Sequence, residues 1–381
     1  MPTPEPIQAS DRRTAGAGLA CPKAVAPTTL KLAKRLGLRY IDTDNLTLGR
    51  RRRGKKFSYV DANGRAIRDP ATLDRLKRLA VPPAYEDVVY AEDPQAHIQA
   101  IGRDAAGRLQ YRYHPEWVKV RELRKARRLA NLAEALPRIR RSVARHLGAD
   151  EPSRELALSA VIELVARSAI RPGSEAYARL RGTRGAATLL KSNLVVAGDA
   201  ITLKFRAKGG KMVVKEVIAT RLCAAIAVLR LLPGRRLFQY RHESGAVRAA
   251  TAGDVNAFLR ELAGMHISLK DFRTLLASVS VLETLSKATP AASKRARRRQ
   301  VLEAIRLAAE DLANTPAICA KSYVHEAVVT AFEEGALEQF AETLRSSRSI
   351  AKREQVLIQV IEQVSQPTIS RPSRRGVTGH A

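Results

Sequence analysis

The sequence predicts an α+β fold with two domains: a small antiparallel β-rich N-terminal domain and a mostly α-helical domain that contains one β-hairpin. From about residue 38 to 115, short strand-like runs are separated by turn signals such as DANG and DAAG, which is typical of hairpins. From about residue 116, apolar residues recur at three-and-four spacing, as in LALSAVIELVARSAI. That spacing is typical of amphipathic helices.

Composition sets the outer limits of these domains. Residues 1–30 mix Pro, Ala, Thr and Gly without periodicity, so we expect a disordered leader there. The β-rich domain is then predicted at 31–115 and the helical domain at 116–365. A polar stretch at 366–381 is predicted to be a disordered tail.

In the β-rich domain, the predicted strands are RYI, KKFSYV, GRAIRD, DVVYAED, AHIQAIGRD and LQYRYH, and one helix, ATLDRLKRLA, stops before Pro82. The run GRRRRGKK, residues 49–56, has almost the spacing of a P-loop. Lys stands where Ser or Thr is needed, however, and a strand follows instead of a helix. We therefore expect this run to lie along a phosphate backbone, with a solvated charge cluster as the alternative.

The last strand of this domain, GRLQYRY, carries a second pattern. Alternation puts Arg108, Gln110 and Arg112 on one face, whereas Tyr111 and Tyr113 share the other. Arg and Gln are side chains that read base edges, and Tyr offers a ring and a phosphate donor. The pattern favours a DNA-binding strand, although an ordinary strand with one aromatic face fits it equally well.

The helical domain follows from its periodicity. Helices are predicted at 117–147, 154–171, 217–231, 253–264, 270–287, 294–313, 316–332 and 335–345. Between two of them, AITLKFRAK-GG-KMVVKEV predicts a hairpin whose tight turn is Gly209-Gly210. Alternation places Lys204, Arg206 and Lys208 on one face, with Lys208 at the turn.

The charge balance indicates the partner. Lys and Arg number 67 against 37 Asp and Glu, which gives a formal net charge of +30 and a pI of about 10.8. Such an excess suits a polyanion, most often nucleic acid. No stretch of 18 apolar residues, no signal-peptide pattern and no Cys-x-x-Cys pair is visible. We expect an intracellular protein without a membrane partner, a disulfide framework or a zinc site.

The candidate active residues centre on the stretch NTPAICAKSY. Thr315 suits an N-cap and Pro316 the first helical position, so a helix is predicted to carry Tyr323 about two turns in, with Asn314 just outside its start. On its own, a tyrosine on a helix is usually a packing residue. Three basic residues elsewhere in the chain, Arg171, Lys208 and Arg273, each lie in a recognisable local structure and indicate that Tyr323 has a functional role.

Each of these cations also has an ordinary explanation. Arg171 ends an apolar helix before Pro172-Gly173, where a cation complements the helix C-terminus. Lys208 at a hairpin turn is by default a solvated lysine. Arg273 lies near a helix start, an unfavourable place for a cation, which indicates either an anionic ligand or an ion pair with an acid such as Asp271.

Taken together, the order Arg171, Lys208, Arg273, Asn314, Tyr323 resembles that of type IB DNA topoisomerases of the short bacterial and poxvirus type. The matching stretches are RPGSEAY, which ends in Tyr177, and KFRAKGGK, ISLKDFRT, NTPAICAKSY, GRLQYRY and LAVPPAY. The resemblance covers roughly residues 38–345 in colinear order. The family often has an aromatic residue and a Gly where this chain has Leu275 and Ala277.

The resemblance implies a monomeric C-shaped clamp around duplex DNA, in the cytoplasm and associated with the nucleoid. It implies that Tyr323 is the nucleophile of a 3′-phosphotyrosyl intermediate and that Arg171, Arg273 and Asn314 bind the phosphate. Lys208 is then the general acid, and no cofactor, ATP or metal is needed. DNA-binding residues are expected at Arg108, Gln110, Tyr111, Tyr113 and Tyr177.

Two other functions are compatible with parts of the pattern. A tyrosine recombinase shares the Arg, Lys, Arg and Tyr logic, but it usually has His-x-x-Arg where this chain has Lys270-Asp-Phe-Arg273, and its N-terminal domain is helical. A basic DNA-binding protein without enzymatic activity fits the composition as well. The order of the motifs favours the topoisomerase.

Overall fold

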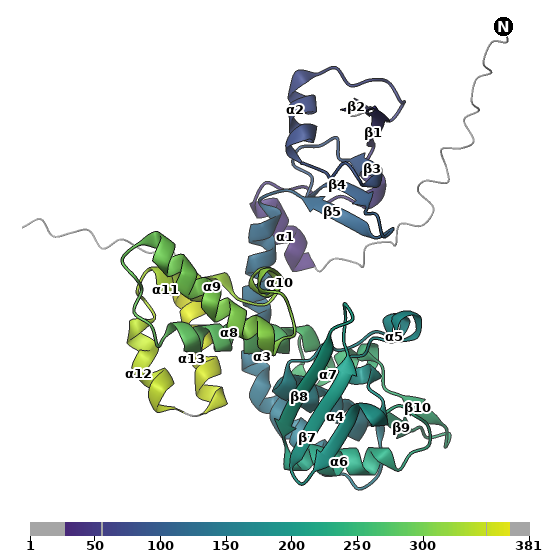
Figure 1. Cartoon of the computed structure of the whole chain (residues 1–381), viewed down its shortest axis with the longest axis vertical. Helices are drawn as coiled ribbons and strands as arrows, with labels where there is room; N and C mark the ends of the chain where they lie inside the picture. Colours follow the sequence, from purple (N-terminus) through teal and green to yellow (C-terminus); the bar gives the residue numbers. More distant parts are fainter. Residues whose placement is uncertain (1–26, 55, 348, 366–381) are drawn as a thin grey trace, which may run out of the picture. The chain divides into compact units, whose positions relative to one another are not determined.

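The computed structural model describes residues 27–54, 56–347 and 349–365 of the chain. The chain divides into two compact units, Met1–Arg124 and Lys125–Ala381. The first contains an antiparallel sheet and the second is mostly helical, so the predicted α+β class is confirmed (Figure 1). The predicted leader is wrong for its last four residues, because helix α1 (Pro27–Arg35) already begins there. The rest of the leader and the predicted tail lie outside the described residues.

The sheet of the first unit has the strand order β2-β1-β3-β4-β5, with every neighbouring pair antiparallel. The strands are β1 (Leu48–Arg53), β2 (Lys56–Val60), β3 (Glu86–Tyr90), β4 (Ile98–Arg103) and β5 (Leu109–Tyr113). Helix α2 (Pro70–Arg78) begins where the Asp69 carboxylate accepts the N–H of Thr72. The cluster on one face includes Leu48, Leu76 of α2 and Tyr90.

Two predicted strands of this unit are wrong, and one strand was missed. RYI and GRAIRD make only single bridges, Arg39 to Ala96 and Ala66 to Val60. The second cannot extend far beyond its bridge, because Asp69 caps helix α2, which begins at Pro70. β1 was missed because four consecutive arginines hide the alternation of a strand.

In the second unit, helices surround one buried helix. Helix α3 (Trp117–His146) crosses the division between the units. The others are α4 (Arg154–Ser168), α5 (Glu175–Arg181), α6 (Thr220–Arg230), α7 (Ala252–Ala263), α8 (Leu269–Leu285), α9 (Lys294–Asp311), α10 (Pro316–Ser322), α11 (Glu326–Glu333), α12 (Glu338–Ser346) and α13 (Ile350–Ser365). Of these, α5 and α13 were not predicted.

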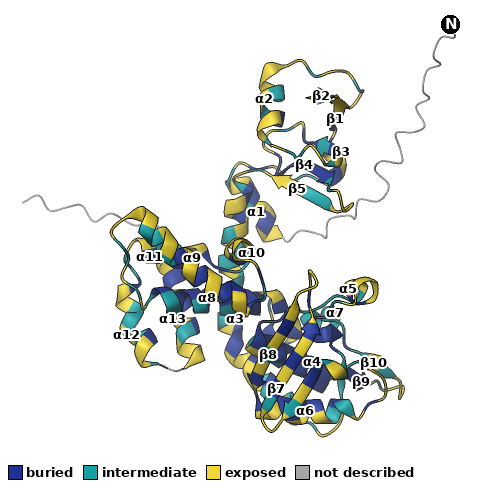
Figure 2. Cartoon of the chain, viewed as in Figure 1, coloured by how far each residue is buried: buried dark blue, intermediate teal, exposed yellow. Residues whose placement is uncertain are grey.

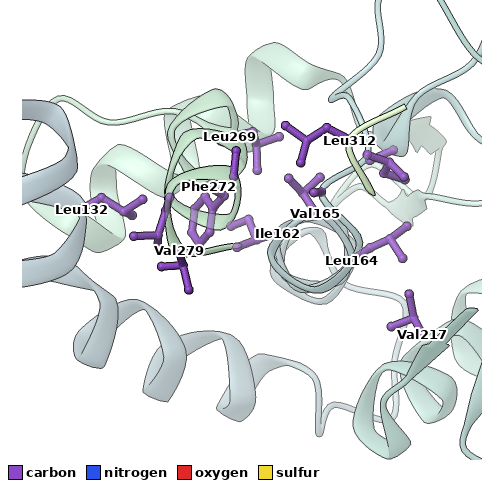
Figure 3. Packing of buried hydrophobic residues seen from close by; sticks show 14 of the residues in the cluster. Leu132, Ile162, Leu164, Val165, Val217, Leu269, Phe272, Val279 and Leu312 are labelled. Carbon is purple, nitrogen blue, oxygen red and sulfur yellow. The ribbon is translucent and has the colours of Figure 1, made fainter. Parts of the chain in front are cut away.

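Helix α4 is the centre of this unit. It contacts α6, α7, α8 and strand β8, and most of its residues are buried (Figure 2). Figure 3 shows Ile162 and Val165 on the side of Phe272 from α8, and Leu164 on the side of Val217 from β8. A helix that is apolar all round belongs in the interior. Its C-terminal end, just before Arg171, is therefore held firmly in place.

The predicted hairpin is present, but the predicted two-residue turn is wrong by one residue. The Ala207 N–H donates to the Lys211 carbonyl, so Lys208, Gly209 and Gly210 form a three-residue loop. Strands β7 (Ala200–Arg206) and β8 (Met212–Ile218) pair from Ala200 opposite Ile218 to Arg206 opposite Met212. Gly209 and Gly210 have φ of 82° and 78°, values that favour glycine. The structure adds β6 (Leu194–Ala197) to this sheet and a second hairpin of β9 (Gln239–Arg241) and β10 (Val247–Ala249), which were not predicted.

The predicted helix 316–332 is broken, and this changes the setting of the candidate nucleophile. Thr315 caps α10 and Pro316 opens it, as predicted. The helix ends at Ser322, however, so Tyr323 is its C-cap residue and not an interior one. The break arises because His325 caps the next helix, α11, by accepting the N–H of Ala327.

Candidate active site

Arg273 is the most buried cation of the site, with 1% of its surface exposed. Its guanidinium donates to the carbonyl oxygens of Ala169 and Leu312, the C-cap residues of α4 and α9. Helix C-termini carry partial negative charge, so two helix ends stabilise a cation that the start of its own helix disfavours. The alternative partner, Asp271, instead caps α8 by accepting from Ser268. Burial lowers the pKa of Arg273, but an arginine stays charged.

Tyr323 lies against this guanidinium. The Arg273 Cζ is 4.7 Å from the centroid of the Tyr323 ring, and the Lys270 Nζ is 5.8 Å from it. Burial alone would raise the pKa of the phenol. The charges of Arg273, Arg171 and Lys270, together with a hydrogen bond from Arg273, outweigh burial and lower the pKa of Tyr323 below its ordinary value. The site therefore favours the phenolate, the nucleophilic form.

Arg171 and Asn314 form the other side of the site. The half-buried Arg171 donates to the carbonyl of Ala313, with an Nη1–O distance of 3.4 Å, and to the side-chain oxygen of Asn314. Both site arginines are thus anchored on consecutive carbonyls, those of Leu312 and Ala313. Because the Asn314 oxygen accepts from Arg171, its Nδ2 is left as a donor.

Two buried donors of the site have no partner within the described part of the chain. They are Nε of Arg273 and Nδ2 of Asn314. An unsatisfied buried donor costs about 1–3 kcal/mol, so each one calls for an explanation. An anion that accepts from both would supply it.

The backbone around Tyr323 is held from two other helices. The Ser278 hydroxyl of α8 donates to the Tyr323 carbonyl at 3.1 Å and accepts the His325 N–H at 3.0 Å. The Lys125 ammonium of α3 donates to the carbonyl of Val324 at 2.9 Å. Since Arg273 and Ser278 share α8, one helix positions both the guanidinium and the backbone of the tyrosine.

Lys208 lies elsewhere in the second unit. Its ammonium is 5.8 Å from the ring centroid of Tyr177, and Arg181 approaches the same ring at 5.6 Å. Among the described residues, no hydrogen bond or ring contact joins Lys208 to Tyr323, Arg171 or Arg273. The structure therefore brings together four of the five predicted catalytic residues, and Lys208 is placed beside the exposed Tyr177 instead.

In the first unit, the predicted DNA-binding residues lie on strand β5, except Arg108, which immediately precedes it. Arg108 and Gln110 both bind the Asp104 carboxylate, at 2.7 and 2.9 Å, and the hydrogen bond from Arg108 is the main reason that the pKa of Asp104 falls to about 2. Tyr111 and Tyr113 are each 39% exposed and stack with ring centroids 5.9 Å apart. These aromatic side chains are available to a partner, whereas the two polar ones are already engaged.

Comparison with known proteins now identifies the family. Residues 115–350, which include the whole Tyr323 site, match the catalytic core of eukaryotic DNA topoisomerase I. The chain belongs to the type IB DNA topoisomerases. Residues 56–104 match the N-terminal domain of bacterial DNA topoisomerase IB. A DNA topoisomerase 1B of Acanthamoeba polyphaga mimivirus is 29% identical over 283 residues, which cover 72% of this chain and 84% of the viral protein.

The resemblance drawn from the motifs is thereby confirmed, and DNA is the substrate of this topoisomerase. In the described parts of the topoisomerase, no helix has the length and apolar character needed to cross a bilayer. Across the same residues, no group of three or more His, Cys, Asp or Glu side chains is arranged to hold a metal ion.

Sequence reasoning missed three residues that shape the site of this topoisomerase. Lys270 reaches the Tyr323 ring, and Ser278 and Lys125 hold the Tyr323–His325 backbone. Lys270 could have been found, because it precedes Arg273 by three residues and so shares its helix face. Ser278 and Lys125 act through contacts between residues distant in sequence, for which the sequence carries no local signal.

The buried His325 predicts a loss of stability in mild acid. It is 5% exposed, and burial is the main reason that its pKa falls from 6.5 to about 4. Between these two values the unfolded chain binds a proton that the folded chain does not, so stability falls as the pH drops from about 6.5 to 4. We expect urea unfolding at pH 4.5 and 7 to show a contribution on the order of 2–3 kcal/mol from this group.

The variant that tests this is His325→Asn, which keeps an acceptor for the cap of α11 but does not titrate. It should lose less stability between pH 7 and 4.5 than the wild type does. His266→Asn, at an exposed histidine of the same unit, should keep the wild-type pH dependence. Equal pH dependence in wild type and His325→Asn would refute the assignment.

Proposed function

We propose that this topoisomerase relaxes supercoiled duplex DNA by cutting one strand through Tyr323 and resealing it, without ATP or a metal ion. The Tyr323 oxygen attacks a phosphodiester, the phosphorus–O5′ bond breaks, and a 3′-phosphotyrosyl ester forms. The free 5′ end rotates and its hydroxyl then attacks the ester, which restores the strand and releases Tyr323. The bond energy is retained in the ester, so no external energy source is required.

One observation carries the proposal: the Tyr323 ring lies on the Arg273 guanidinium beside two buried donors, Arg273 Nε and Asn314 Nδ2, that have no partner among residues 27–54, 56–347 and 349–365. Attack on a phosphodiester concentrates negative charge on its two non-bridging oxygens. Arg171, Arg273 and Asn314 then bind that charge more tightly in the transition state than in the ground state. Forked guanidiniums suit phosphate geometry better than an ammonium does.

Proton handling divides between two residues. A free phenol has a pKa of about 10, so the lowered pKa of Tyr323 increases the attacking fraction. The leaving 5′-oxygen is an alkoxide whose conjugate acid has a pKa near that of water and far above neutral pH, so it needs a proton donor. We assign Lys208 to that role, which requires the Gly209-Gly210 turn to carry its ammonium from Tyr177 to the scissile phosphate.

We further propose that the enzyme acts as a monomer on nucleoid DNA in the cytoplasm. All five proposed catalytic side chains come from one unit of one chain. The net charge of +30 favours a location on chromosomal DNA. Duplex contacts are assigned to Gln110, Tyr111 and Tyr113 on β5, to Arg108 just before it, and to Tyr177 on α5.

The decisive experiment is relaxation of positively and negatively supercoiled plasmid in EDTA without ATP, followed by denaturing electrophoresis of the trapped complex. We expect relaxation of both signs and one covalent adduct at the 3′ side of the nick. Strand exchange between plasmids would indicate a recombinase instead. Binding without any nick would leave only a DNA-binding protein, and in both cases the proposal is overturned.

Lys208→Ala tests the general acid separately. Removing a proton donor typically slows a reaction by about 10²–10⁴-fold, and we expect that loss in single-turnover cleavage. A substrate with a 5′-bridging phosphorothiolate should restore the rate, because a thiol leaving group has a pKa of only about 8.5 and needs no proton.

The matched control is Lys211→Ala, an exposed lysine just past the same turn. It removes the same charge from the hairpin and should cleave both substrates like the wild type. If Lys208→Ala remains slow on the phosphorothiolate, Lys208 is not the acid.

A further inference from the structure

The described residues of the basic run, 49–54 and 56, belong to β1, the turn and the first residue of β2, so they lie toward the tip of the β1–β2 hairpin. In this hairpin, Arg51 lies opposite Ser58 and Arg53 lies opposite Lys56. Directly opposed residues of an antiparallel pair point to the same face of the sheet. Arg51, Arg53 and Lys56 therefore share one face of the hairpin tip, and all three are exposed.

The strand register relates this face to the strand that we assign to DNA. Gly49, two residues before Arg51, lies opposite Val89, Val89 lies opposite Ile101, and Ile101 lies opposite Tyr111. Arg51 and Tyr111 are thus on the same face, near opposite edges of the five-stranded sheet. The other face packs against α2 through Leu48, Leu76 and Tyr90.

The arginines of the run do not all have the same role. Arg50 points to the α2 face, donates to the carbonyls of Val81, Pro82 and Tyr85 at 2.7–3.0 Å, and lies over the Phe57 ring. It stabilises the fold. Among the described residues, no ion pair or hydrogen bond engages the guanidinium of Arg51 or of Arg53; the Ser58 hydroxyl donates only to the Arg51 backbone carbonyl.

Nearby acids do not neutralise the tip either. Asp87 pairs with Arg103 at 3.4 Å, the Asp61 carboxylate accepts backbone N–H groups of its own turn, and Asp104 binds Arg108. As far as the described residues go, the tip therefore presents uncompensated positive charge on the face that carries the exposed Tyr111. Unpaired arginines gathered at an exposed hairpin tip suit a phosphate-bearing partner.

The spacing indicates which phosphates these would be. With about 4.8 Å between neighbouring strands, β1 and β2 lie roughly 14–19 Å from β5. The major groove of DNA is about 12 Å wide and admits a β-ribbon. If β5 occupies that groove, the tip lies beyond the edge of the groove, over the neighbouring sugar–phosphate backbone.

We propose that Arg51, Arg53 and Lys56 form a second DNA contact in the first unit, which binds phosphates outside the groove that β5 enters. The proposal rests on the function proposed above, in that β5 is the strand that meets DNA. According to this proposal, the tip adds affinity for DNA that does not depend on base sequence. It also lengthens the DNA segment that the protein covers. At about 3.4 Å per base pair, the tip extends that segment by roughly four to six base pairs.

The test is the salt dependence of duplex binding by Arg51→Ala/Arg53→Ala, measured in a Tyr323→Phe background. Reading binding alone keeps the result independent of whether Tyr323 is the nucleophile. Each phosphate contact contributes a slope of about −0.9 in log K against log salt, so two lost contacts should make the slope shallower by nearly two units. Between 50 and 200 mM salt, the variant should then lose about tenfold less affinity than its parent.

The matched control is Lys77→Ala/Arg78→Ala on α2, which packs on the opposite face of the sheet and loses the same formal charge. This control should keep the parent slope. Thermal melting of both variants should be unchanged, because all four side chains are exposed. If the slope of log K against log salt changed equally in the two variants, the effect would come from the lost net charge and not from the tip. The proposal would then be overturned.

Duplex length gives a second readout. When a duplex is shortened one base pair at a time from each end, the parent should lose affinity at one end as the last four to six pairs of its bound segment are removed. The tip variant should be insensitive to those pairs. If parent and variant respond identically to truncation, the tip does not contact DNA.

Discussion

Tyr323→Phe should abolish covalent adduct formation and plasmid relaxation while changing duplex affinity by no more than about twofold. The substitution removes the only atom that our proposal assigns to attack, and no other group can take its place in the ester. Phenylalanine keeps the aromatic face, so the contact with the Arg273 guanidinium at 4.7 Å can persist and the surrounding packing should hold. Denaturing electrophoresis of the trapped complex, relaxation assays and equilibrium binding measure the three quantities.

A matched control removes a phenolic hydroxyl from the same unit without touching the site. Tyr240→Phe, at a buried residue of β9, should relax plasmid at the wild-type rate. An adduct that survives in Tyr323→Phe would identify another nucleophile, and the proposed role of Tyr323 would then be wrong.

Most of the fold could be predicted because its signals are local. The start of α10 is one example, since a Thr cap followed by Pro at the first position is visible in the sequence and present in the structure. The hairpin that turns at Gly209 and Gly210 is another, because both glycines have the positive φ expected of them, although the loop also includes Lys208. The break after Tyr323 could not be predicted, because it depends partly on the Ser278 hydroxyl, which lies 45 residues away and holds the Tyr323 carbonyl.

The candidate site shows the same division. Residue types and motif order were enough to choose Arg171, Arg273, Asn314 and Tyr323, but not to explain why a buried arginine is tolerated. That depends on Ala169, a non-glycine residue with φ of 55°, which ends α4 so that its carbonyl meets the Arg273 guanidinium. Left-handed backbone at an alanine costs about 1–2 kcal/mol, and no sequence rule anticipates it.

Arg273→Ala should have the second-largest effect, on both catalysis and stability. Loss of one preorganised donor to a developing oxyanion costs about 10²–10³-fold in rate, and we expect at least that in single-turnover cleavage. The change also leaves the carbonyls of Ala169 and Leu312 without this donor and opens a cavity, so the free energy of unfolding should fall by about 2–5 kcal/mol.

Conservative variants separate the two effects through the pH dependence of cleavage. Arg273→Gln removes the charge that lowers the pKa of Tyr323, so cleavage should require a higher pH than in the wild type. Arg273→Lys keeps a charge but loses the fork, and should cleave slowly with a nearly unchanged pH profile. A purely structural role would lower the rate of both variants without moving either profile.

Arg297→Ala is the matched control for stability, because this half-buried arginine also donates to a backbone carbonyl, that of Glu333, at 2.7 Å. No contact joins it to Tyr323 within the described residues, so it should lose stability and keep cleavage at temperatures where it is folded. If Arg297→Ala lost cleavage as Arg273→Ala does, the activity loss in both would reflect a weakened fold. The loss of cleavage in Arg273→Ala would then be no evidence that Arg273 binds the phosphate. The two helix ends that hold Arg273 beside Tyr323 matter for catalysis only if the guanidinium acts on the reacting phosphate.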